Sequence, residues 1–403
     1  MSTAGPDITQ LVDPDAHEWL TATRWEPERA RAAVASIATR TEEAFDPDEL
    51  WPPHPLDQEP DAPPLRRLAS LYLGAAGVIW ALHALTRAGL TEPGRDWAPV
   101  AATLSERYLL APDFEDVGAV PSLWMGEAGI LLVAHTLAPA AWQEERLLDV
   151  VCANVDHPSR ELMWGSPGTM LASQEMLART GDERWRSAWA DAADRLWDAW
   201  GDDVWEQDLY GRRVHILGPA HGFAGIVHAL AHGGLLDADR SRALAPRAAS
   251  ALGKHALRVE GLAQWRPSLE ASSVPRRTQW CHGAPGIVAT LGSLEPANAE
   301  LTELLVAGGE LTWRAGPLAK GAGLCHGTAG NGYAFLALFA RTGDELWLGR
   351  ARAFAMHALE QVERAIALDA RGRHTLWTGD PGTALFLASC IDAQPGFPTI
   401  DRW

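Results

Sequence analysis

The hydrophobic and polar positions along this chain form two kinds of helical pattern. In the first kind, apolar residues recur every three or four positions between charged ones, as in ERWRSAWADAADRLWDAW at residues 183–200. Similar amphipathic segments lie at residues 142–155, 298–313 and 345–367. Apolar residues at this spacing share one face of a helix, so each segment predicts a helix with one buried side. We find no sustained strand-type alternation, and the pattern therefore predicts an all-helical protein.

The second kind is an almost wholly apolar segment introduced by the phrase Gly-x-[Ala/Pro]-Gly, for example LYLGAAGVIWAL from Leu71. The phrase occurs seven times, at intervals of roughly 40 to 60 residues. Its first glycines are Gly74, Gly126, Gly165, Gly222, Gly283, Gly327 and Gly379. An interval of this length accommodates two helices and their loops, so the phrase marks seven repeats of a helical pair.

We interpret each repeat as an amphipathic outer helix followed by an apolar inner helix that begins at the glycine phrase. Glycine there permits special backbone angles and the close approach of neighbouring helices. An inner helix that is apolar on all sides must be buried, and repeats bury such faces by stacking on their neighbours. Seven copies, with the reactive residues concentrated in a few of them, favour a closed ring with one central site. An open solenoid is the alternative.

The chain before the first repeat has a different character. Residues 27–45 have a helical pattern, and residues 46–64 are rich in proline, which predicts an irregular, extended connection. This connection could cap the ring or lie across its mouth. We therefore predict an N-terminal lead at residues 1–64 that packs on the ring, and a single repeat domain at residues 65–403.

The formal net charge of −18 argues against non-specific binding to nucleic acid or to an anionic membrane. No apolar stretch reaches the roughly 18 residues of a membrane span, and residues 1–15 lack the pattern of a signal peptide. Four cysteines in 403 residues do not indicate a disulfide framework. We expect a cytoplasmic protein that acts as a monomer.

The two positions before the first glycine of each phrase carry the candidate reactive side chains. They are Ala220–His221 in the fourth copy, Cys281–His282 in the fifth and Cys325–His326 in the sixth. Equivalent positions of a repeat point to the same end of the inner bundle, so these side chains should converge from three adjacent repeats. Two thiolates and an imidazole are ligands that suit Zn²⁺.

The set Cys281, Cys325 and His326 supplies three ligands and leaves one tetrahedral position open, as in catalytic zinc sites. A fourth ligand from His282 or His221 would instead make a closed structural site. An open site can ionise a substrate thiol or activate a water molecule. Two thiolate ligands weaken the Lewis acidity of the metal, which favours thiol delivery over water activation.

Candidates for proton transfer lie at the same end of the bundle. His221 occupies the equivalent position without a cysteine beside it, and imidazole titrates near neutral pH, which suits a general acid or base. His282 is a second candidate. Glu161, four residues before Gly165, offers a carboxylate near the same end, or else serves as a helix cap or a surface acid.

The remaining cysteines and several histidines are interpreted as core residues, because an isolated cysteine or histidine on an apolar face is usually one. These residues are Cys152, Cys390, His83, His135, His228, His232, His255 and His357.

The sequences AHGFAGI around His221, WCHGAPG around Cys281 and CHGTAGNGYAFL from Cys325, with the seven glycine phrases, closely resemble lanthionine synthetase C-like proteins over residues 71–387. The resemblance implies an all-α fold, a double-layered α/α toroid of seven inner and seven outer helices. It implies zinc held by Cys281, Cys325 and His326, and a general acid or base at His221. It also implies an enzyme that adds a thiol to dehydroalanine or dehydrobutyrine and so forms a thioether of the lanthionine type.

Two branches of that family differ in the thiol that they use. Dedicated cyclases close lanthionine rings in precursor peptides, whereas stand-alone members of the eukaryotic type add glutathione to dehydroamino acids in proteins. His282 stands where cyclases typically carry Tyr, and Glu161 where they carry Asp, which resembles the glutathione-adding branch. Lys320 in LAKGAGLCHG is similar to that branch too and could pair with a glutathione carboxylate. The implied partners are a dehydrated peptide or protein and either glutathione or a peptide cysteine.

Two other functions are compatible with a helical ring. Some helical toroids are glycosidases, but those need a pair of carboxylates across the cleft, and Glu161 is alone among the converging positions. A non-catalytic scaffold that binds zinc or glutathione would use the same residues as the enzyme.

Overall fold

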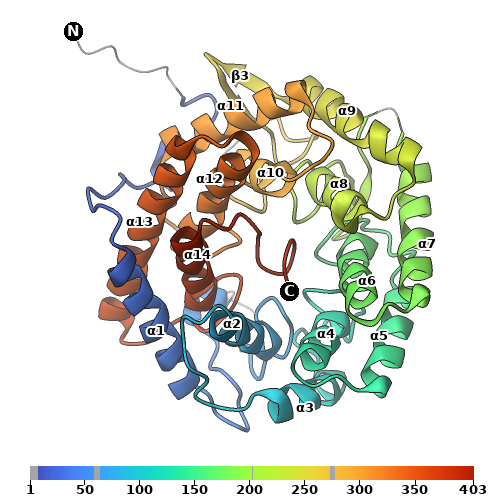
Figure 1. Cartoon of the computed structure of the whole chain (residues 1–403), viewed down its shortest axis with the longest axis vertical. Helices are drawn as coiled ribbons and strands as arrows, with labels where there is room; N and C mark the ends of the chain where they lie inside the picture. Colours follow the sequence, from blue (N-terminus) through green and yellow to red (C-terminus); the bar gives the residue numbers. More distant parts are fainter. Residues whose placement is uncertain (1–7, 59–63, 202, 273–276) are drawn as a thin grey trace.

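The computed structural model describes residues 8–58, 64–201, 203–272 and 277–403, which form two concentric layers of helices (Figure 1). The inner layer consists of α2 (Ala75–Arg87), α4 (Glu127–Leu137), α6 (Ser166–Thr180), α8 (Phe223–Ala231), α10 (Ala284–Leu291), α12 (Thr328–Thr342) and α14 (Asp380–Asp392). The outer layer consists of α1 (Pro27–Glu43), α3 (Ala98–Leu110), α5 (Ala141–Ala153), α7 (Glu183–Ala199), α9 (Ala238–His255), α11 (Ala299–Ala315) and α13 (Glu345–Asp369). The predicted all-α toroid is confirmed in the described part of the chain.

The second glycine of each phrase sets the spacing between neighbouring inner helices. A Cβ atom added at Gly129 would lie 2.9 Å from the Cβ of Leu71 in the preceding repeat, and 2.0 Å from the carbonyl oxygen of Leu123. Equivalent close approaches join each repeat to the one before it, and Gly77 of the first repeat meets Leu376 of the seventh in the same way. The ring is therefore closed, because the contact that joins neighbours also joins the first copy to the last.

The first glycine of the phrase precedes the first residue of every inner helix, as predicted. Its backbone seldom needs the freedom of glycine, since six of the seven first glycines have a negative φ. Gly283 is the exception, with a φ of 107°. The expectation of special backbone angles thus holds at Gly283. The general reason for glycine in the phrase is the close approach of neighbouring backbone and side-chain atoms.

Replacing Gly129 by alanine should destabilise the ring. The added methyl group would meet a backbone carbonyl that cannot move freely, and overpacking of this kind typically costs about 1–3 kcal/mol. The matched control is Gly349→Ala in the outer helix α13, where an added Cβ meets nothing within 4 Å and helix propensity favours alanine. Denaturant midpoints measure both variants, and equal stability of the two would contradict this role of the phrase.

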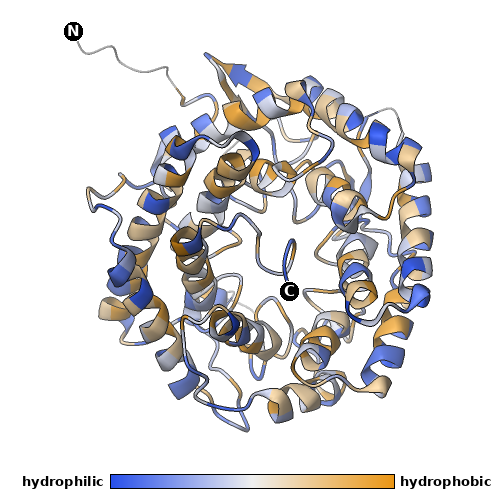
Figure 2. Cartoon of the chain, in the orientation of Figure 1, coloured by the Kyte–Doolittle hydropathy of each residue, from blue (hydrophilic) through white to orange (hydrophobic). Residues whose placement is uncertain are grey.

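The outer helices are amphipathic, and their apolar faces cover the inner layer. In α7, Asp182 caps the first turn by accepting a hydrogen bond from the backbone N–H of Arg184, and Trp185, Trp189 and Leu196 are buried on one face. Figure 2 shows hydrophilic residues along the outer rim and more apolar residues between the layers. No helix in the described part of the chain combines the length and the apolar character that crossing a bilayer requires.

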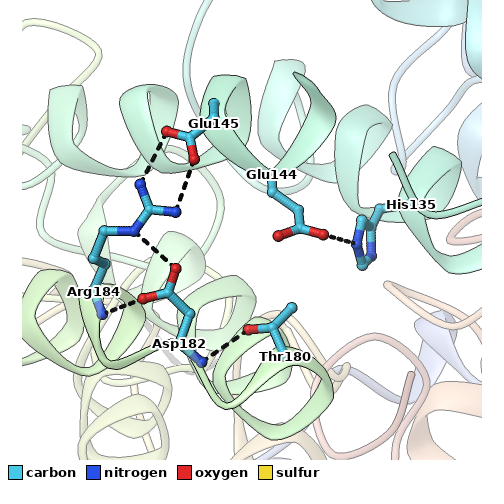
Figure 3. A network of polar contacts seen from close by, with 6 residues as sticks. All are labelled: His135, Glu144, Glu145, Thr180, Asp182 and Arg184. Atoms are coloured by element: carbon cyan, nitrogen blue, oxygen red, sulfur yellow. Dashed lines mark hydrogen bonds and ion pairs between the residues drawn. The ribbon is translucent and has the colours of Figure 1, made fainter. Parts of the chain in front are cut away.

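Hydrogen bonds and ion pairs connect neighbouring helices (Figure 3). His135 Nε2 of the inner helix α4 lies 3.1 Å from Glu144 Oε1 of the outer helix α5. Arg184, at the start of α7, donates to both carboxylate oxygens of Glu145 in α5, at 2.9 and 2.8 Å. Arg184 and Glu145 are at least half exposed, and such pairs contribute about 1 kcal/mol or less. The Arg184–Glu145 pair therefore adds little to the stability of the fold.

The predicted helical lead is α1, which lies in the outer layer beside α13 and α14 (Figure 1). Arg29 of α1 donates to Glu363 of α13 at 2.9 Å. The proline-rich connection that follows contains the short 3-10 helix η2 (Pro55–Asp57), and residues 59–63 of this connection lie outside the described residues, as do residues 1–7 of the lead. The boundary at residue 64 stays a prediction.

Two short antiparallel hairpins, which the sequence pattern did not predict, lie in loops between outer and inner helices. They are β1 (Gln207–Leu209) with β2 (Arg212–Val214), and β3 (Leu257–Val259) with β4 (Leu262–Gln264). Strands of three residues are too short to show alternation. Their turns, Tyr210–Gly211 and Glu260–Gly261, have positive φ at both positions, as two-residue type I′ hairpins require. Two further 3-10 helices are η1 (Pro14–Ala16) and η3 (His232–Gly234).

The segment after α14 runs into the centre of the ring, where the chain ends (Figure 1). Phe397 of this segment stacks on Trp280 and Trp377, with ring centroids 4.9 and 5.6 Å apart. Trp124 packs against the same two tryptophans at 6.0 and 4.6 Å. Since these side chains come from three repeats and from the C-terminal segment, they close the centre of the ring with a buried aromatic cluster.

Candidate metal centre

The candidate ligands lie where backbone hydrogen bonds hold equivalent positions of neighbouring repeats together. The N–H of Cys281 donates to the carbonyl of Cys325 at 3.0 Å, and the N–H of Cys325 donates to that of Trp377 at 2.9 Å. Trp377 donates in turn to Tyr72, at 3.4 Å, across the junction between the seventh and first repeats. These residues all stand two positions before the first glycine of their phrase. The inner helices therefore present them at one end of the ring, in a fixed register.

Cys281, Cys325 and His326 come together at this end, with their possible ligand atoms all within 4.8 Å of one another. Both thiols are buried, and the imidazole is partly exposed. A hydrogen bond with Cys325 lowers the pKa of the Cys281 thiol well below its ordinary value, against the effect of burial and with further help from His326. Gln279 Nε2 also donates to Cys281 Sγ at 2.9 Å. Because the site favours a thiolate and has the ligand types that zinc prefers, these residues fit a Zn²⁺ ion.

His221 is paired with Glu161 across 60 positions of sequence. Its Nδ1 lies 2.9 Å from Glu161 Oε2, and the Glu161 side chain is fully buried. That carboxylate also accepts hydrogen bonds from Ser159 Oγ and from the backbone N–H groups of Met163 and Trp164, at 2.7–2.9 Å. With its other contacts made to donors, Glu161 accepts from His221, which places a proton on Nδ1 of the imidazole and leaves Nε2 for other partners. Glu161 is thus neither a surface acid nor a simple helix cap.

The electrostatics of this pair favour a protonated imidazole. Burial lowers the pKa of His221, but the hydrogen bond and the charge of Glu161 outweigh burial, and the pKa ends above its ordinary value. The ring of His282 lies 5.8 Å from that of His221, centroid to centroid. Burial lowers the pKa of His282 to about 4, and its Nδ1 has no hydrogen-bond partner among the described residues. Of the two candidate histidines, His221 is the one with a carboxylate behind it.

Several further residues contribute to this site that were not predicted from the sequence. The hydroxyl of Tyr72 hydrogen-bonds with the Cys325 thiol, and burial raises the pKa of that phenol well above its ordinary value. Tyr72 stands at the same position of its repeat as the two cysteines, and Gln279 at the same position as Glu161. The repeat register that identified the cysteines would therefore have identified both residues. Tyr210 lies outside the repeat phrases, in the β1–β2 turn, so the repeat register could not have identified it. The centroid of its ring is 6.1 Å from that of the His221 ring.

Basic residues border the site. The hydrogen bond with Cys281 and burial raise the pKa of Cys325 well above its ordinary value, and the charge of Lys320, an exposed residue, opposes that rise. Arg277 is also exposed, and its charge acts on His221 and His282. In a chain with a net charge of −18, two cations at this end of the ring form a local region that would attract a negatively charged substrate.

The proline-rich connection reaches the same end of the ring through Asp57. Its side chain is buried and accepts hydrogen bonds from Thr378 Oγ1 at 2.6 Å and from Arg373 Nε at 2.9 Å. Thr378 is the residue that directly precedes the first glycine of the seventh phrase. These hydrogen bonds hold the connection beside the candidate site. The amino-acid pattern did not predict where on the ring the connection lies.

The cysteines outside the site differ from each other. Cys390 is buried in α14, as expected of a core residue. Cys152 is exposed on α5, so its interpretation as a core residue is wrong. It lies on the polar side of an amphipathic helix, where its neighbours face solvent.

The sequence matches the family model described as "Lanthionine synthetase C-like protein" over residues 67–401. It is similar to "LanC-like protein GCL1" of Arabidopsis thaliana, with 34% identity over 202 residues, which cover 45% of this chain and 42% of that protein. It is also similar to "Glutathione S-transferase LANCL1" of Danio rerio, with 36% identity over 134 residues, 30% of this chain and 31% of that protein. The aligned stretches span less than half the length of either relative.

Among solved structures, nisin cyclase superimposes with a TM-score of 0.57 and 16% identity, over 90% of this chain and 93% of that chain. At this identity the likeness concerns the fold alone, which is the same helical ring. The family model covers most of the described residues, including all seven glycine phrases, and the fold agrees with it. The chain therefore belongs to the lanthionine synthetase C-like family.

Proposed function

We propose that this protein adds a thiol to the β-carbon of dehydroalanine or dehydrobutyrine and thereby forms a thioether. The observation that carries the proposal is the His221–Glu161 pair beside the cluster of Cys281, Cys325 and His326. A Zn²⁺ ion held by that cluster would supply an open coordination position, at which a substrate thiol loses its proton at neutral pH. A Michael-type addition also requires an acid that can protonate the α-carbon of the acceptor.

The protein side of the reaction is proton transfer to carbon. The sulfur of the ionised thiol attacks the β-carbon, a C–S bond forms, and the π electrons of the double bond move toward the carbonyl oxygen. His221 Nε2 donates a proton to the α-carbon of the resulting enolate, and Glu161 holds the imidazole in the orientation and tautomer that this step needs. The proton gained at the α-carbon balances the proton lost by the thiol.

We further propose that the thiol is a small anionic one of the glutathione type. Lys320 and Arg277 supply positive charge near the cluster, and a tripeptide thiol with two carboxylates complements both. The curated relatives include a protein named a glutathione S-transferase, which supports the same choice. A dehydrated peptide or protein would be the acceptor, and a peptide cysteine as the thiol, which would make the protein a cyclase, is the alternative.

We propose that the reaction takes place in a reducing, cytoplasmic compartment, because none of the four cysteines forms a disulfide. A monomer suffices for it, since every proposed group comes from one chain. A glycosidase is disfavoured, because Glu161 is held by its hydrogen bonds and Asp57 is paired with Arg373. Neither carboxylate is free to attack a sugar.

The test is an incubation of the zinc-loaded protein with a dehydroalanine peptide. One sample contains added glutathione, and a second contains a peptide with its own cysteine. We expect a glutathione adduct by mass spectrometry in the first. Ring closure leaves the peptide mass unchanged, so the second sample is read by loss of the free thiol with an alkylating reagent. Ring closure alone would favour the cyclase, and no product in either sample would favour a non-catalytic scaffold.

A further inference from the structure

A second cluster of potential metal ligands lies at the other end of the inner helices. His228 and His232 belong to α8 and the residue that follows it, and Asp401 belongs to the C-terminal segment. The candidate ligand atoms of these three residues all lie within 4.8 Å of one another. His228 is the sixth of the nine residues of α8 and His232 follows the helix, so the two lie roughly 8 and 14 Å along its axis from the end that presents the candidate metal centre.

The two histidines are placed as ligands from one helix usually are. They are four residues apart, so they lie on the same helix face, and their rings stack with centroids 5.2 Å apart. His228 Nδ1 lies 3.1 Å from the carbonyl oxygen of Thr290, which accepts a hydrogen bond only if Nδ1 carries the proton. That bond leaves Nε2 with a free lone pair, as in metal sites where a second-shell carbonyl fixes the tautomer.

Among the described residues, none donates a hydrogen bond to the lone pair of His228 Nε2. Nε2 is buried and makes no hydrogen bond of normal geometry with a described residue, although the carbonyl of Ile400 is close. Asp401 Oδ1 lies 3.4 Å away. Two ligands at bond lengths of about 2.0–2.2 Å around a tetrahedral ion are roughly 3.4 Å apart. The separation therefore matches two atoms that share an ion better than it matches a hydrogen bond.

The carboxylate of Asp401 is also held in place. The backbone N–H of Phe397 donates to its Oδ2 at 2.7 Å, so that Oδ1 is turned toward His228. All three residues line a cavity of about 450 Å³ between the ends of α8, α10 and α12 and the C-terminal segment. A cavity of this size has room for the water molecules that would complete the coordination of an ion.

We propose that His228, His232 and Asp401 bind a divalent transition-metal ion of the zinc class, which fastens the C-terminal segment to the inner ring. Two imidazole nitrogens and one carboxylate oxygen are ligands that zinc accepts. The segment so held carries Phe397 to Trp280, the neighbour of Cys281, and thus completes the aromatic centre of the ring. This assignment replaces the interpretation of His228 and His232 as ordinary core residues, and it does not depend on the proposed reaction.

The test counts metal in the full-length chain after chelation and titration with Zn²⁺. The Cys281→Ala/Cys325→Ala variant, which lacks the thiolate ligands, should still bind one equivalent. Adding Asp401→Asn or His232→Ala should abolish that binding. Adding His135→Ala should leave it unchanged, because this buried histidine pairs with Glu144 (Figure 3) and belongs to no cluster of potential ligands among the described residues. Circular dichroism verifies that each variant is folded.

Wild-type protein provides an independent measurement. It should bind two equivalents, and His232→Ala one. Zn²⁺ should also slow the release of C-terminal residues by a carboxypeptidase at least several-fold in the variant without thiolate ligands. No binding by that variant in its folded form would overturn the proposal, as would binding that survives the changes at His232 and Asp401. Unchanged carboxypeptidase digestion would overturn the fastening role. None of these measurements depends on thioether formation. The metal-site proposal and the proposed function can therefore be refuted independently of each other.

Discussion

Replacing Cys325 by alanine should remove one equivalent of bound zinc and abolish thioether formation. The thiol of Cys325 is buried next to that of Cys281, and its loss leaves one thiolate and one imidazole, too few ligands for an ion of the zinc class. Changes in residues that only support metal ligands already cost about 10–100-fold, so activity should fall by more than about 100-fold. Metal analysis and the glutathione adduct assay measure the two effects.

The matched control for this variant is Cys152→Ala, because Cys152 is an exposed thiol in the outer layer. It should keep full metal content and activity. A Cys325→Ala protein that is folded, free of metal at this centre and still fully active would show that addition occurs without the cluster. The proposed function would then be wrong, whereas the second metal site would be untouched.

Replacing His221 by asparagine should keep the metal and slow the addition by roughly 10²–10⁴-fold, the usual contribution of a general acid. The asparagine amide can still donate to Glu161, which avoids leaving a buried carboxylate without its partner. His255→Asn is the control, since His255 also pairs with a carboxylate, Asp203, but lies in the outer helix α9. A loss of metal in His221→Asn, or an unchanged rate, would contradict the role of His221 as the acid.

The companion variant Glu161→Gln tests how the acid is tuned. Glu161 raises the pKa of His221, so the imidazolium persists to a higher pH in the native protein. With glutamine the raised pKa should fall, His221 should lose its proton at a lower pH, and the alkaline limb of the rate–pH profile should move to lower pH. A limb that stays in place would show that the acid is another group.

The helices, their two kinds and their sevenfold order could be predicted from the amino-acid pattern alone. Periodicity and glycine phrases are local signals, so the start of each inner helix could be predicted from neighbouring residues. The repeats also predicted contacts between helices, because residues at equivalent positions of neighbouring repeats lie at the same end of the stack. For that reason Cys281, Cys325 and His326 could be expected together, and Tyr72 and Gln279 could have been added by the same argument.

The three-dimensional fold joins segments that share no repeat register. It pairs Glu161 with His221, places Asp57 of the proline-rich connection beside Thr378, and brings Asp401 to His228. These contacts depend on where irregular loops and a chain end come to rest. Packing of distant residues governs such positions, and a local pattern of hydrophobic and polar residues does not encode it.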